Sequence, residues 1–340
     1  MGHARITRRA FASAAVCAVG ALAVPGAFAQ ARPERPRLTL GVSQRSELQY
    51  LPLTVAEQLG FFRAEGLEVE IVETAAGAQA ADVTCGPYEQ TLGLQARGVF
   101  MQSIVLQGRA PAVALGVSPR ALPQLRSVGE LRGRRIGIPA PGTPSHLVAK
   151  LVLLRAGIDP ADMQFVGVGG TAAATMALRA GQIDALCNGE PAMTMLEQRA
   201  EVRIVSDTRT LKGTEAVFGG PMPSACLYAP QEFVQRNPGT CQALAHAIVH
   251  ALKWLQTAGP RDILRTVPEP YLLGDRALYL ASFEKVRESL STDGRLPLEG
   301  ARTALRALAA FDPGLRIERV DLGRTFTNEF AQRAKERFRA

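Results

Sequence analysis

Residues 51–70 read LPLTVAEQLGFFRAEGLEVE, and this stretch shows the pattern that decides the fold. Pro52 stands in the first turn of a predicted helix, where proline is best tolerated, and apolar residues recur at every third position of residues 53–62. Gly66 is placed to end the helix, and residues 69–73 alternate apolar and acidic side chains, as in a half-buried strand. The stretch therefore predicts a helix that leads directly into a strand.

The same alternation continues on both sides of this stretch. The runs that we interpret as further strands are residues 37–43, 81–85, 102–106, 135–139, 164–168, 183–187 and 202–206. The helical patterns cover residues 144–156, 171–180, 231–236, 241–257 and 276–290. Strands that alternate with helices predict an α/β fold with parallel sheets.

The order of these elements predicts two lobes. Residues 115–222 hold a complete alternating array of the size of a domain. The last third of the chain is mainly helical, so it must pack on strands supplied by the first section. We therefore expect one lobe from residues 36–114 and 223–340, a second lobe from residues 115–222, and two chain crossings that form a hinge.

The N-terminal segment is typical of an export signal. Three arginines precede the apolar residues 10–24, and Ala27-Phe28-Ala29 offers the small residues of a cleavage site. We expect residues 1–29 to be removed and the mature protein to reach the periplasm. Residues 7–11 resemble a twin-arginine signal, and the general secretory route is the alternative.

The charge of the chain does not indicate a nucleic-acid partner. The net charge is +8 and aromatic residues make up only 6% of the chain. The arginines are scattered rather than clustered, and export would separate the protein from nucleic acid. We expect a monomer that has no nucleic-acid partner.

Four cysteines follow the predicted signal: Cys85, Cys187, Cys226 and Cys241. Their spacing fits no zinc or redox motif, so we expect neither a metal nor a cofactor. Each lies in an apolar stretch, which favours buried free thiols. A disulfide between Cys226 and Cys241 is the alternative in an oxidising compartment.

Four segments in order resemble a known family. Residues 51–70, the ELRGRRIGIP of residues 130–139, the AGQIDA of residues 180–185 with Glu190-Pro191, and the TFTNEF of residues 325–330 are similar to motifs of nitrate/sulfonate/taurine-type substrate-binding proteins. These belong to a superfamily with thiamine-pyrimidine-binding proteins and yeast-type pyrimidine synthases. The resemblance implies a type II periplasmic-binding fold, capture of a small solute, and delivery to the inner-membrane permease of an ABC importer.

The ligand of such a fold is expected at the carboxyl ends of strands, beside helix N-termini that carry free N–H groups. The residues that follow the predicted strands are therefore the candidate ligand contacts. They are Ser43, Gln44, Gly86, Tyr88, Arg109, Thr143, Ser145, His146, Thr171, Asn188 and Glu190.

Several of these candidates have a second interpretation. Arg109 is suited to a carboxylate or sulfonate but could instead pair with Glu89. Ser43, Thr143 and Thr171 could cap helices, Tyr88 could pack in a lobe, His146 could lie on a helix surface, and Glu190 could hold the hinge. The turn at residues 142–145 offers backbone donors. Basic and acidic candidates, Arg45 and Arg109 with Glu89 and Glu190, together suit a small anionic or zwitterionic solute such as taurine, an alkyl sulfonate, an aromatic carboxylate or an aminopyrimidine.

Two other functions are weighed against transport. A Ser–His–acid triad needs a histidine near a strand end, and two of the three mature histidines lie on one predicted helix. The cysteine-rich motif of the pyrimidine synthases is missing from the sequence, so we expect no catalysis. A sensory module that reports ligand to a membrane receptor is the remaining alternative.

Overall fold

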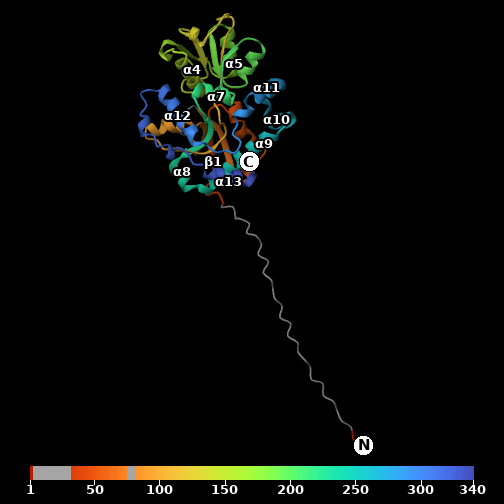
Figure 1. The fold of residues 1–340 in the computed structure, drawn as a ribbon. Helices are drawn as coiled ribbons and strands as arrows, with labels where there is room; N and C mark the ends of the chain where they lie inside the picture. Colours follow the sequence, from red (N-terminus) through yellow and green to blue (C-terminus); the bar gives the residue numbers. More distant parts are fainter. Residues whose placement is uncertain (3–31, 75–80) are drawn as a thin grey trace. The chain divides into compact units, whose positions relative to one another are not determined.

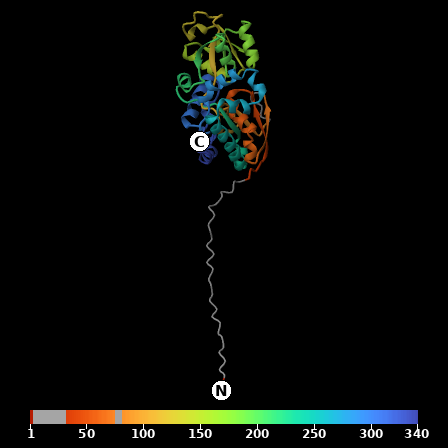
Figure 2. The same ribbon diagram turned by 90° about the vertical axis from the view of Figure 1, so that its right-hand side faces the viewer.

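The computed structural model describes residues 1–2, 32–74 and 81–340. Residues 32–340 form one compact unit, built from two five-stranded sheets with helices around them (Figure 1, Figure 2). The predicted export signal and its cleavage site lie outside the described residues, apart from residues 1–2. No helix in the described part of the chain is long and apolar enough to cross a membrane.

The first sheet has the strand order β2-β1-β3-β10-β4. Strand β1 pairs in parallel with β2 and β3, whereas β10 is antiparallel to β3 and β4. The strands are β1 (Arg37–Val42), β2 (Glu68–Glu73), β3 (Val83–Pro87), β4 (Met101–Leu106) and β10 (Ala225–Pro230).

The second sheet has the order β7-β6-β8-β5-β9. Strand β6 is parallel to β7 and β8, and β5 is antiparallel to β8 and β9. The strands are β5 (Ala114–Val117), β6 (Arg135–Ile138), β7 (Gln164–Gly167), β8 (Ala185–Asn188) and β9 (Arg203–Asp207).

The α/β class is confirmed, but the prediction of parallel sheets was wrong. In each sheet the fourth strand, β10 or β5, is the one at which the chain arrives from the other sheet, and it runs against its neighbours. Apart from that strand, both sheets share one order. The direction of a strand depends on where the chain enters the sheet, and local sequence does not carry that information.

Thirteen α-helices surround the sheets in the described part of the chain. They are α1 (Leu51–Gln58), α2 (Phe61–Ala64), α3 (Glu89–Ala96), α4 (Pro144–Arg155), α5 (Thr171–Arg179), α6 (Ala192–Gln198), α7 (Leu211–Phe218), α8 (Gln231–Arg236), α9 (Pro238–Thr257), α10 (Pro260–Thr266), α11 (Arg276–Val286), α12 (Leu298–Phe311) and α13 (Glu329–Phe338). The single helix predicted after Pro52 is divided into α1 and α2, because Gly60 adopts a left-handed conformation between them.

Two large apolar clusters organise the core. One surrounds α9, which packs against α1, α2 and α13. The other extends from Tyr88 and Tyr228 in the first-sheet part to Ile136 and Leu147 in the second, and includes Ala304 of α12. Helix α12 packs on both α3 and α4. The parts built on the two sheets therefore share a continuous apolar contact along α12.

Candidate ligand-binding cleft

A cavity of about 260 Å³ lies where the carboxyl ends of strands from both sheets meet. We call it the central cavity. Residues after β1 and β3 form one side of it, and residues after β6, β7 and β8 form the other. Its polar lining consists of Ser43, Gln44, Glu47, Gln49, Tyr50, Thr74, Gln90, Thr143 and Ser145.

Two further cavities share residues with the central cavity. The side cavity, of about 380 Å³, shares Gln44 and Glu47 with it and extends to the start of α5 and the end of β8. The apolar chamber, of about 280 Å³, shares Ser43, Gln90 and Gly142 with it and extends along α3 and α12. The three cavities form a cleft between the parts built on the two sheets.

Eight of the predicted site residues line this cleft. The sequence places them far apart, and the strand ends bring them together. They are Ser43, Gln44, Gly86, Thr143, Ser145, Thr171, Asn188 and Glu190. Their contact with a ligand stays a prediction.

Thr143 and Thr171 differ from their predicted capping roles. Thr143 occupies the position before α4, but its hydroxyl donates to the backbone oxygen of Ala140 at 2.7 Å instead of capping the helix. Thr171 is the first residue of α5, and Gly170 precedes it. Neither hydroxyl caps its helix, and both residues line the cleft.

Tyr88 is a core residue, so the prediction that it stacks on a ligand was wrong. Its side chain is fully buried, and its hydroxyl lies 2.7 Å from Oγ1 of Thr325. Its ring meets Phe326 edge to face. The strand β3 ends one residue before Tyr88, and this turns the ring into the apolar cluster.

Arg109 and Arg45 are not among the described residues that line the three cavities. The Nε of Arg109 donates to the backbone oxygen of Glu288 at 2.8 Å. Arg109 forms no ion pair with Glu89, so that pairing was wrong, and its contact with a ligand stays a prediction. Arg109 lies where the chain passes from the first sheet to the second, and it anchors that crossing. Arg45 forms an ion pair with Glu57.

His146 braces the turn before α4. Its Nδ1 accepts a hydrogen bond from the N–H of Gly142 at 3.1 Å, and its ring packs edge to face on Phe165 and Phe311. Burial, aided by the charge of Lys150, lowers the pKa of His146 to about 4. The imidazole is therefore neutral at pH 7. It is not among the described residues that line the three cavities, and its contact with a ligand stays a prediction.

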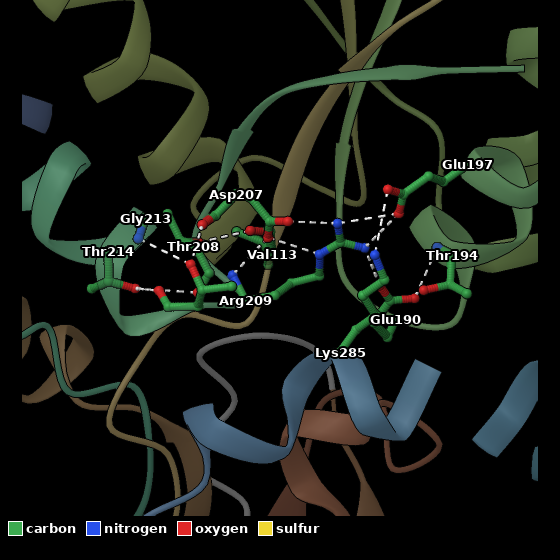
Figure 3. Close-up of polar contacts among 11 residues, drawn as sticks. Val113, Glu190, Thr194, Glu197, Asp207, Thr208, Arg209, Gly213, Thr214 and Lys285 are labelled. Carbon is green, nitrogen blue, oxygen red and sulfur yellow. Dashed lines mark hydrogen bonds and ion pairs between the residues drawn. The ribbon is translucent and has the colours of Figure 1, made fainter. Parts of the chain in front are cut away.

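Glu190 is held by a buried arginine that sequence reasoning missed (Figure 3). The Nη1 of Arg209 donates to Oε1 of Glu190 at 2.6 Å, and Oε2 of Glu190 accepts from the N–H of Thr194 at 3.0 Å. Arg209 also forms two hydrogen bonds with Asp207, at 2.7 and 2.8 Å. The side chains of Arg209 and Glu190 are 1% and 0% exposed. Both oxygens of Glu190 are therefore paired inside the second-sheet part, which favours its second interpretation, and its role at a hinge stays a prediction.

The Arg209 cluster also reaches the first-sheet part. Glu197 lies 3.3 Å from Arg209, and its other oxygen lies 3.5 Å from Nζ of Lys285 on α11. Glu288, next to α11, accepts from the N–H of Leu211 at the start of α7. These contacts join the second-sheet part to α11 near the crossing.

The central cavity has an acidic and a donor-rich side. Glu47 is the one charged side chain among its described lining residues, and burial raises the pKa of Glu47 to about 7 despite a hydrogen bond from Gln49. Across from the β1 end, Ser145 lies in the first turn of α4, where unpaired N–H groups and the helix dipole favour an anion. Sequence reasoning missed Glu47, although it follows β1 in the same loop as Ser43.

The four cysteines that the structure describes form no disulfide. Cys85, Cys187, Cys226 and Cys241 are buried free thiols, so that prediction is confirmed and the Cys226–Cys241 alternative was wrong. Within the described residues, no group of three or more histidine, cysteine or acidic side chains is placed to hold a metal ion.

Comparison with known proteins finds solved structures that are similar to this chain. The solved structure of a protein from Bordetella bronchiseptica RB50 is 46% identical, covers 91% of this chain and 99% of its own, and superposes with a TM-score of 0.86. The alkanesulfonate-binding protein SsuA from Xanthomonas axonopodis pv. citri, bound to MOPS, is 19% identical, covers 86% of this chain and 98% of its own, and has a TM-score of 0.65.

A third relative is an importer component. The nitrate import ATP-binding protein NrtC from Synechococcus elongatus is 26% identical over 249 residues, which are 66% of this chain and 37% of NrtC. The family model described as NMT1/THI5 like matches residues 47–260. These residues include both crossings and most of the cleft lining, and the chain belongs to the NMT1/THI5-like family.

Proposed function

We propose that the protein is the periplasmic solute-binding component of an ABC importer, which captures a small anionic or zwitterionic solute in the cleft. The observation that carries this proposal is the central cavity itself, because its lining comes from the strand ends of both sheets. A solute there would touch both parts of the molecule at once. It would therefore favour whichever arrangement brings those parts together.

The two sides of the central cavity favour a zwitterion. The start of α4 suits an acidic group, because its free N–H groups donate. Glu47 suits an ammonium group or another N–H donor on the opposite side. Gln44, Gln49 and Gln90 add neutral hydrogen-bonding groups, which fix orientation without favouring either charge.

Closure in this proposal moves two lobes, residues 36–114 with 223–340 and residues 115–222. Arg109 and the Arg209 cluster lie at the crossings, where a hinge needs firm anchors. A permease that accepts only the closed form would then receive only loaded protein. The similarity to NrtC and the resemblance to SsuA support the importer role, and the export signal in the sequence supports the periplasmic location.

The test is to identify what the cleft holds. Residues 30–340 are incubated with a bacterial small-molecule extract, separated from unbound solutes and denatured, and the released solutes are identified by mass spectrometry. Ser43→Trp fills the exposed rim that the central cavity and the apolar chamber share. Thr257→Trp is the matched control, because Thr257 at the end of α9 is also exposed and is not among the described residues that line the three cavities.

We expect the unchanged protein and Thr257→Trp to release the same solute and Ser43→Trp to release at least tenfold less. Release of no solute by the unchanged protein, or of equal amounts by all three proteins, would contradict the proposal.

A further inference from the structure

The apolar chamber differs in chemistry from the central cavity, with which it shares Ser43, Gln90 and Gly142. Its walls come from β3, α3 and α12 and from Leu147 of α4. The apolar side chains that line it are Leu94, Met101, Leu147, Leu308, Phe311 and Leu315. A wall of this kind suits a hydrocarbon chain or a ring, because burying apolar area is favourable.

One wall of this chamber carries a buried carboxyl group. Glu89 is the first residue of α3, is only 8% exposed, and lines the chamber. Its Oε2 is buried and has no hydrogen-bond partner in the structure. Burial raises the pKa of Glu89 to about 7. An unpaired buried acceptor is costly, so such a group is expected to have a use.

Two other buried glutamates in the described part of the chain are paired with charged groups. Glu190 is bound by Arg209, and Glu65 by Arg337 and His246. The basic residue among the chamber's described lining residues, Arg97, has a side chain that is 66% exposed and faces Asp312 at 3.9 Å. Among residues 32–74 and 81–340, no lysine, arginine or histidine lies within salt-bridge distance of Glu89.

We propose that the apolar chamber is a second subsite of the cleft, which receives the apolar body of the solute and places a nitrogen hydrogen-bond donor at its far end against Oε2 of Glu89. The solute is then an elongated molecule. Its acidic group lies at the start of α4, its apolar chain or ring lies in the chamber, and its amine or similar donor lies at Glu89. This inference rests on the proposed function, because the chamber opens onto the central cavity.

The chamber is tested by isothermal titration calorimetry with two matched sets of compounds. The first set is 6-aminohexanoate, hexanoate and adipate. The second set is 4-(aminomethyl)benzoate, 4-methylbenzoate and terephthalate. Within each set the acid at one end is constant and only the far end changes, so the ratio of dissociation constants measures recognition of that end.

We expect the amine of each set to bind residues 30–340 at least tenfold more tightly than its methyl-ended partner, hexanoate or 4-methylbenzoate. The diacid of each set should bind most weakly. Glu89→Gln should reduce the tenfold preference to threefold or less. Leu308→Trp, which fills the chamber, should weaken the amines at least tenfold. Glu232→Gln on the exposed face of α8 is the matched control and should change nothing.

Three results would overturn the inference: equal binding of amines and their partners, a preference that survives Glu89→Gln in a protein with unchanged melting temperature, or no binding by either set. Failure of the chamber alone is distinguishable from failure of the proposed function. In that case the solute captured from the extract is still lost in Ser43→Trp but is retained in Leu308→Trp.

Discussion

Glu190 and Glu89 are both buried carboxyl groups, 4% and 8% exposed, yet their surroundings differ completely. Each oxygen of Glu190 has a partner, Arg209 on one side and the N–H of Thr194 on the other. Glu89 has an oxygen with no partner and faces an apolar chamber. The first arrangement makes a charge part of the framework. The second leaves a charge, or a proton, available to a bound solute.

The largest loss of stability is expected when Glu190 loses the cation with which it is paired. Arg209→Ala leaves Glu190 and Asp207 without their cation, and an orphaned buried charge typically costs about 3–5 kcal/mol. Urea unfolding should show a loss of this size. Arg179→Ala, which removes an exposed partner of Glu201, is the control and should cost less than about 1 kcal/mol. Equal losses in the two variants would show that the Arg209 cluster is not a framework.

The unpaired carboxyl group of Glu89 should make the protein less stable when it is charged. Because the folded pKa of Glu89, about 7, is above its ordinary value of 4.5, the folded state binds its proton more tightly than the unfolded state does. The wild type should therefore lose stability as the pH rises from about 4.5 to 8. Glu47, whose pKa is also raised to about 7, adds to the same trend.

Glu89→Gln should remove one part of this pH dependence, on the order of 1–3 kcal/mol between pH 5 and pH 8. Melting temperatures measured across that range check it, with Glu190→Gln as the matched variant. Glu190→Gln should lower stability at pH 8, since it removes the charge that Arg209 binds. If wild type and Glu89→Gln showed the same dependence of melting temperature on pH, Glu89 would not be the unpaired buried group described above.

A smaller effect is expected at Tyr88, a buried group with a partner. Tyr88→Phe removes the hydroxyl that lies 2.7 Å from Thr325, and such a change typically costs about 1 kcal/mol. Binding of 6-aminohexanoate should be unchanged within twofold, because the ring packs in the core. A tenfold loss of binding would show that Tyr88 contacts the solute.

The smallest effect is expected from Arg109→Ala. Its guanidinium is partly exposed and donates to one backbone oxygen, so the free energy of unfolding should fall by less than about 1 kcal/mol. The dissociation constant of 4-(aminomethyl)benzoate should change less than twofold. A loss above tenfold would show that Arg109 contacts the solute after all.

Periodicity was enough to predict most strands and helices. Strands β1 and β6 lie within one residue of their predicted bounds, because alternating apolar residues record burial directly. The mixed direction of the sheets could not be predicted, since β5 and β10 obtain their direction from the crossings. The break at Gly60 was also missed, because a glycine inside a helical pattern is compatible with either outcome.

The position of the cleft could be predicted from the sequence, but the pairing of its charged residues could not. The rule that ligands lie beyond strand ends identified Ser43, Gln44, Thr143 and Ser145. It could not show that Arg109 is turned toward residues 288–289, that Arg209 reaches Glu190 nineteen positions earlier, or that Glu89 has no counter-charge. Ion pairing and burial depend on tertiary contacts between distant elements. The sequence identifies the charged residues but not the residues that contact them in the folded protein.

The most direct measurement of the central claim is the distance across the cleft with and without solute. Met176 on α5 and Leu273 are 62% and 50% exposed, and their elements lie on opposite sides of the side cavity. The described native cysteines are buried, so spin labels on Met176→Cys and Leu273→Cys can be measured by double electron–electron resonance. Solute capture by closure predicts a shorter and narrower distance distribution after the captured solute is added. An unchanged distribution with the solute bound would contradict it.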